Sequence, residues 1–193
     1  MKAVTVDQVM AWEPCQEYTR ERVEALFAGR EALTAADIVN LVDIPALDKM
    51  FAILHPEFLT EQQAHYLACD FAETALPAFE RLFPTDTAPR LAVEAKRAWI
   101  RGEISDEELI AARAAARARV RELDTTRNTG EFDMARYAAW KSILAVSHAA
   151  SVINDRITWK SAWSVATNTA WLAARTIEDV EAQLRKALEV ING

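Results

Sequence analysis

One stretch of this chain carries three side chains that could bind a metal ion or support thiol chemistry. In HYLACDFAE, residues 65–73, the side chains of His65, Cys69 and Glu73 recur every four residues. A helix would therefore present an imidazole, a thiol and a carboxylate on one face. A His and a Cys at this spacing can share a zinc ion. Together with His148, they would make a helical metal protein or enzyme.

The same face continues as an apolar stripe, and this favours packing over chemistry. Ala72, Leu76, Phe79 and Phe83 follow at helical spacing. A cysteine in such a stripe usually behaves as a small buried hydrophobic side chain. We therefore expect Cys69 to be buried and unreactive, and we expect no cofactor at this position.

Asp70 and Glu73 have a structural interpretation of their own. Both carboxylates lie within reach of basic side chains on the same helix or on a neighbouring one. The chain also lacks the GxGxxG, GxxxxGK[ST], HExxH and GxSxG motifs and an EF-hand loop, and its three histidines are far apart. The sequence therefore predicts a protein that is not an enzyme and has no metal centre.

A second candidate site is a line of arginines in AARAAARARVREL, residues 111–123. Arg113, Arg117 and Arg121 lie four residues apart and repel one another by about a few tenths of a kcal/mol per pair. The line could contact an acidic partner, a nucleic acid or the acidic first half of this chain. We favour ion pairs within the chain, and a partner contact remains the alternative.

A third candidate is a line of tryptophans in WKSAWSVATNTAW, residues 159–171. Trp159, Trp163 and Trp171 share one helical line with Thr167. Aromatic side chains often anchor interfaces, although a ladder of this kind more often fills a core. We keep the three tryptophans and the three arginines as candidate partner-binding residues.

The elements that position these side chains are helices. Glycine is scarce, with 4 residues, whereas Ala, Leu, Glu and Arg are abundant, and no β-strand alternation or hairpin turn is evident. Helix start signals recur at Thr5, Pro14, Thr34, Asp43, Thr60, Pro89, Ser105, Asp133 and Thr176. The prediction is an all-α fold, a single compact bundle of about nine helices.

The chain divides into two regions that we expect to form one continuous domain. The sequence predicts an N-terminal accessory helical region over residues 1–60 and the main helical bundle over residues 61–193. The stretch DTTRNTGEF, residues 124–132, is the most loop-like segment and the best candidate for a joint.

Composition limits the classes of function. The 193 residues are 51% hydrophobic and 26% charged, which is ordinary for a globular protein. No apolar run approaches the ~20 residues that cross a bilayer, and MKAVTVDQVMAWEP lacks the apolar core of a signal peptide. Two cysteines outside any CxxC pair suit the cytoplasm.

The net charge of −7 is concentrated in the first half of the chain. Residues 1–90 carry 7 Lys and Arg against 15 Asp and Glu. This bias argues against a general nucleic-acid binder, because such proteins present positive charge to phosphates. It leaves open a basic protein partner.

Residues 69–103, CDFAETALPAFERLFPTDTAPRLAVEAKRAWIRGE, resemble a bacterial and phage family of helical proteins described as immunity proteins. The matching features are a Cys-x-x-Ala-Glu helix, the pair Leu76–Pro77, Pro84 with Asp86, Pro89–Arg90, and Trp99 before Arg101–Gly102. An Ala/Arg-rich helix, matched by residues 111–121, and a later helix with His148 complete the likeness.

The resemblance implies an all-helical, non-enzymatic protein that neutralises a toxin or a defence protein by direct contact. A phage-encoded inhibitor of host defence, of the anti-CRISPR kind, is the alternative. The family brings no catalytic residues to this chain. The implied partner is a protein, and the identity of that partner is left open.

Overall fold

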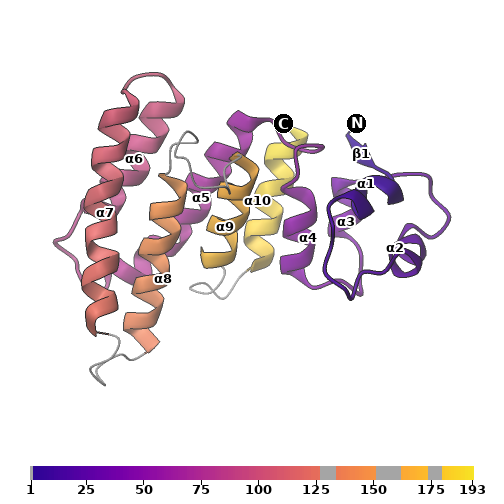
Figure 1. Cartoon of the computed structure of the whole chain (residues 1–193), viewed down its shortest axis with the longest axis horizontal. Coiled ribbons are helices and arrows are strands. Elements are labelled where there is room, and N and C mark those ends of the chain that lie inside the picture. Colours follow the sequence, from indigo (N-terminus) through magenta and orange to yellow (C-terminus); the bar gives the residue numbers. More distant parts are fainter. Residues whose placement is uncertain (1, 127–133, 151–161, 174–179) are drawn as a thin grey trace.

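The computed structural model of the chain is an all-α multi-helix bundle, as the sequence predicts (Figure 1). It describes residues 2–126, 134–150, 162–173 and 180–193. The described elements are β1 (Ala3–Val4), α1 (Val6–Ala11), α2 (Arg20–Phe27), β2 (Leu33–Thr34), α3 (Ala35–Val39), α4 (Ala46–Ile53), α5 (Glu61–Glu80), α6 (Ala88–Ile100), α7 (Asp106–Thr126), α8 (Met134–Ala149), α9 (Ala162–Ala173) and α10 (Val180–Asn192).

The elements are spread along one axis of an elongated molecule. In Figure 1, α6 and α7 stand at one end, and α1 to α3 with the small sheet lie at the other. Helix α5 packs against α6, α8, α9 and α10, and α10 in turn packs against α3 and α4. The molecule is therefore organised around this helix, which carries the HYLACDFAE stretch.

Two main groups of buried side chains divide the core. One joins the N-terminal elements to α5, α8, α9 and α10, and includes Phe27, Phe58 and Phe71. The other lies where α5, α6, α7 and α8 meet, and includes Cys69 and Leu109. Helix α5 contributes to both groups, through Leu67, Phe71 and Ala75 to the first and through Cys69, Ala72 and Leu76 of the apolar stripe to the second.

A two-stranded sheet is present among the described residues, and the helical prediction misses it. Strand β1 pairs antiparallel with β2, with Ala3 opposite Thr34 and Val4 opposite Leu33. Each strand has two residues, which is too short for an alternating pattern to show in the sequence. Val4 and Leu33 are buried, so the sheet closes the N-terminal part of the core.

Four helix starts are confirmed by their capping geometry. The side chains of Thr5, Thr34 and Thr60 accept a hydrogen bond from the backbone N–H three residues on, in a capping box. Ser105 does the same with the N–H of Glu108 at 3.2 Å, while the Glu108 carboxylate accepts from the Ser105 N–H at 2.8 Å. Each box satisfies backbone donors that the helix itself leaves unpaired.

Two predicted starts are wrong. Helix α2 begins after Thr19, whose hydroxyl accepts from the Arg22 N–H, and not at Pro14. Helix α4 begins after Pro45, and not after Asp43. The residue before a proline is disfavoured in the α region, so Ile44 cannot open a helix capped by Asp43. The predicted starts at Asp133 and Thr176 lie outside the described residues.

Candidate functional site

The three side chains of the candidate metal or thiol site, His65, Cys69 and Glu73, do not form a metal-binding group in the described structure. Cys69 is fully buried, and burial raises the pKa of its thiol to about 12. The Glu73 carboxylate instead accepts a hydrogen bond from Arg97 of α6 at 2.7 Å. In the described part of the chain, no group of three or more His, Cys, Asp or Glu side chains could hold a metal ion. The predicted burial of Cys69 is confirmed.

The acidic pair on α5 has the structural role that the sequence predicts. Arg97 Nη2 lies 2.7 Å from Asp70 Oδ1 and 2.7 Å from Glu73 Oε2, and so bridges the two carboxylates. Lys186 of α10 lies 3.8 Å from the other oxygen of Asp70. These ion pairs connect α5 to α6 and α10.

A buried cationic group lies beside His65, and the sequence prediction missed it. Lys96 is fully buried, and its Nζ lies 3.7 Å from the centre of the Trp99 ring. The His65 ring meets the same Trp99 edge-on at 5.4 Å. Lys96 lies four residues after Ala92 and four before Ile100, so the sequence could have predicted that it lies on an apolar helix face.

Burial changes the acid–base properties of both groups. Desolvation, and then the nearby Lys96 charge, lower the pKa of His65 to about 4, so the ring is neutral at pH 7. Desolvation lowers the pKa of Lys96 to about 8. Neither His65 ring nitrogen has a hydrogen-bond partner within the described structure, although Glu61 Oε1 lies 4.0 Å from Nε2.

The arginine line of α7 divides into one engaged and two exposed side chains. Arg113 Nε donates to the Ser147 carbonyl of α8 at 3.0 Å. Arg117 and Arg121 are exposed, and neither forms an ion pair with a residue that the structure describes. Within the described part of the chain, Arg119 forms an ion pair between α7 and the first 90 residues, by contacting Asp86.

His148 lies close to Arg113 and Arg117, and these charges disfavour its protonated form. Desolvation by the surrounding atoms, and then the charges of Arg113 and Arg117, lower the pKa of His148. Part of its side chain still reaches solvent. The arginine face, defined here as Arg113, Arg117 and Arg121 with His148 beside them, is therefore a cationic surface rather than a buried ion-pair network.

The predicted tryptophan line cannot be placed against this face. Trp159 lies outside the described residues, and the side chains of Trp163 and Trp171 in α9 also lie outside them. Their role in partner binding stays a prediction.

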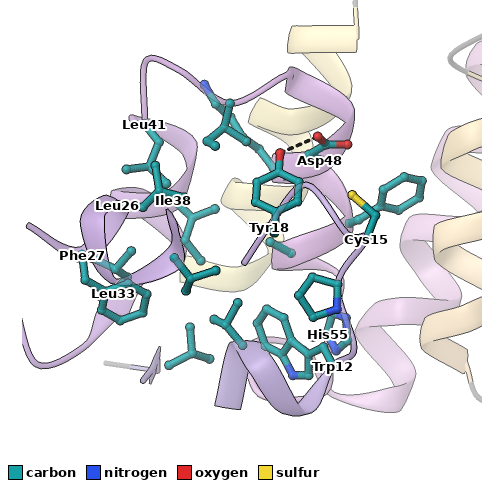
Figure 2. A pocket seen from close by; sticks show the side chains of 18 residues that line it. Trp12, Cys15, Tyr18, Leu26, Phe27, Leu33, Ile38, Leu41, Asp48 and His55 are labelled. Carbon is teal, nitrogen blue, oxygen red and sulfur yellow. Dashed lines mark hydrogen bonds between the residues drawn. The ribbon is translucent and has the colours of Figure 1, made fainter. Parts of the chain in front are cut away.

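An apolar pocket lies at the opposite end of the molecule, in residues 4–55 (Figure 2). Its volume is about 380 Å³, and its walls come from α1 to α4 and the segments that join them. Trp12 stacks on His55 with ring centres 4.0 Å apart, and the Tyr18 hydroxyl donates to Asp48 at 2.5 Å. Local sequence patterns could not reveal this pocket, because it depends on contacts between segments up to about 45 residues apart.

The structure is thus an all-α bundle with an exposed cationic helix face at one end and an apolar pocket at the other. No described helix is long and apolar enough to cross a membrane. The profile of the family described as "Imm-5 like putative immunity protein" matches residues 58–154, which is half of the chain. The chain belongs to this family. Comparisons with curated proteins and with solved structures gave no match.

Membership of this family indicates an immunity-type role and, in general terms, a protein partner. The matched region begins just before α5 and includes all of α6 and α7. It therefore contains the arginine face, whereas the apolar pocket lies outside it.

Proposed function

We propose that this protein neutralises a toxin or a component of a defence system by direct contact, without catalysis. The observation that carries the proposal is the arginine face, because it lies within the family-matched region and exposes two cationic side chains. Arg117 and Arg121 repel each other, and a partner carboxylate would relieve that repulsion. Arginine is also common among residues that dominate binding energy.

The proposed partner surface is acidic and contacts α7. Trp159, Trp163 and Trp171 remain candidates for a second part of the interface. The proposed site of action is the cytoplasm, which suits the two free cysteines, Cys15 and Cys69. A phage anti-defence inhibitor would use the same surface, and the identity of the partner distinguishes it from a toxin inhibitor.

The test begins with capture of the partner by the affinity-tagged protein and by its Arg117→Glu/Arg121→Glu variant. The captured protein is then expressed in a host, alone and with each form of the chain. We expect the wild type to relieve the growth defect and the double variant to fail, because charge reversal turns attraction into repulsion across the interface.

Arg81→Glu provides the matched control. Arg81 is exposed and forms no ion pair with a described residue, and it lies outside the arginine face. This variant should protect the host as well as the wild type does. Equal protection by the double variant would refute the arginine face as the partner surface, and lack of protection by the wild type would refute neutralisation.

A further inference from the structure

The N-terminal pocket has the size and lining of a small-molecule site. Its volume of about 380 Å³ falls within the range of ~300–1,000 Å³ typical of ligand pockets. Figure 2 shows aliphatic side chains, including Leu26, Ile38 and Leu41, facing aromatic ones across the space. Such a lining favours a flat apolar ring system over a strongly polar ligand.

The aromatic wall of the pocket is held in place by its own contacts. Trp12 Nε1 donates to Glu57 at 3.1 Å, and the Trp12 ring stacks on His55 with an interplanar angle of 18°. Trp12 is followed by Glu13, whose φ of 52° lies in the left-handed region that a non-glycine residue adopts at a cost of about 1–2 kcal/mol. The rest of the structure therefore maintains a strained turn that positions Trp12.

A carboxylate marks the polar edge of the pocket. Asp48 Oδ2 accepts the Tyr18 hydroxyl, and no described residue donates a hydrogen bond to Oδ1. Burial, and then this hydrogen bond, raise the pKa of the Tyr18 hydroxyl, so Tyr18 stays a neutral donor. Asp48 can therefore accept a hydrogen bond from a ligand N–H in addition to the one from Tyr18.

The charges near the pocket favour a cation. Glu13, Glu17 and Asp43 are exposed next to lining residues in the sequence, and none forms an ion pair with a described residue. Lys49 is the competing cation in the lining. Arg22 is already engaged, with its guanidinium 4.6 Å from the centre of the Tyr18 ring.

From these observations we propose that the pocket binds a small aromatic amine, with the ring between the aromatic and aliphatic walls and the ammonium at Asp48. Ammonium groups bind well where a carboxylate and aromatic faces meet. This site is separate from the arginine face, so it adds a ligand to the proposed function rather than explaining it.

Calorimetric titration with three indole compounds tests the proposal. All three share the indole ring. Tryptamine is a cation, indole is neutral and indole-3-acetate is an anion. We expect tryptamine to bind most tightly and indole-3-acetate most weakly. Asp48→Asn should weaken tryptamine binding about tenfold and leave indole unchanged, since only the ammonium contact loses a charge.

Glu31→Gln is the matched control, because it removes one exposed negative charge from the same region without changing the lining. It should leave all three affinities nearly unchanged. Lys49→Gln is a second variant, which should strengthen tryptamine binding and does not depend on the Tyr18–Asp48 bond. The proposal is overturned if tryptamine shows no saturable binding, if indole-3-acetate binds as tightly, or if neither pocket variant changes the tryptamine affinity.

Discussion

Cys69 shows how one residue can suggest chemistry by its spacing and packing by its surroundings. Its thiol is fully buried between α5 and its neighbours, with the pKa raised to about 12. A nucleophilic cysteine needs an accessible thiolate, and this position provides neither the access nor the charge.

Cys69→Ser should therefore lower the free energy of unfolding by ~1–3 kcal/mol, because it places a hydroxyl in an apolar site. Chemical denaturation measures the loss. Cys15→Ser is the matched control, since Cys15 is exposed and its replacement should change stability by less than ~0.5 kcal/mol. In the native protein, a thiol reagent should label Cys15 rapidly and Cys69 slowly. Rapid labelling of Cys69 would contradict the packing described here.

His65 should make stability depend on pH. Its pKa is about 4 in the folded protein and near 6.5 when unfolded, so the unfolded chain binds a proton first as the pH falls. The stability contributed by the neutral ring is complete above pH 6.5 and is lost progressively down to about pH 4.

Between pH 7 and pH 5, the wild type should lose on the order of 2 kcal/mol relative to His65→Leu, which cannot titrate at this position. Urea unfolding gives the free energy of unfolding of both proteins at each pH. The difference between the two proteins isolates the contribution of His65 from that of the other titrating groups. Parallel curves for the two proteins would mean that His65 is solvated and not enclosed beside Lys96 and Trp99.

At the scale of elements, the caps of α5 and α6 provide a paired test. Both helices have an exposed threonine as N-cap, but only Thr60 accepts a hydrogen bond through its side chain. Thr60→Ala should cost about 1 kcal/mol of stability, and Thr87→Ala less than about 0.5 kcal/mol. Thermal or chemical unfolding of the two variants measures these losses of stability. Equal losses would show that the capping box at Thr60 contributes nothing beyond the threonine itself.

The helical elements could be predicted where their signals are local. Thr5, Thr34, Thr60 and Ser105 start helices because each cap bonds a backbone group three residues away. Pro14 failed as a start signal because Thr19 offers a side-chain cap closer to the apolar residues of α2. A proline permits a helix start without supplying a cap.

The sites were harder to predict than the elements, for a physical reason. The spacing of Arg117 and Arg121 places both on one helix face, but whether carboxylates oppose them depends on how α6 and α8 pack beside α7. The pocket depends on contacts such as Tyr18 with Asp48, which the sequence separates by 30 residues. No periodic pattern within one element carries that information.

At the scale of the whole molecule, an ion pair between described residues connects α7 to the acidic first half of the chain. Arg119 contacts Asp86, which lies just before α6, and also Glu122 at 2.6 Å within α7. Arg117, two residues earlier, faces elsewhere and forms no ion pair with a described residue.

Arg119→Glu should therefore lower the thermal midpoint, because it turns two attractions into repulsions. Arg117→Glu should not lower the midpoint, because it removes the repulsion from Arg113 and Arg121. Differential scanning calorimetry at low salt measures the thermal midpoints of the two variants. Added salt should reduce the difference between these midpoints, because it screens the charges. If Arg117→Glu lowers the midpoint and keeps the partner affinity, the arginine face is structural and the proposed surface is wrong.

The position of α10 has a consequence for how the protein is made. Helix α10 packs against α3, α4 and α5, and Gln63 donates to the Val190 carbonyl at 2.7 Å. Because α10 is translated after all the elements it covers, those elements leave the ribosome with that side of their core still open. Chains are synthesised at about 5–20 residues per second, so residues 1–60 spend several seconds outside the ribosome before α10 is made. During that interval the sides of α3, α4 and α5 that α10 covers stay exposed, and contacts such as that of Gln63 with Val190 form only after α10 has emerged.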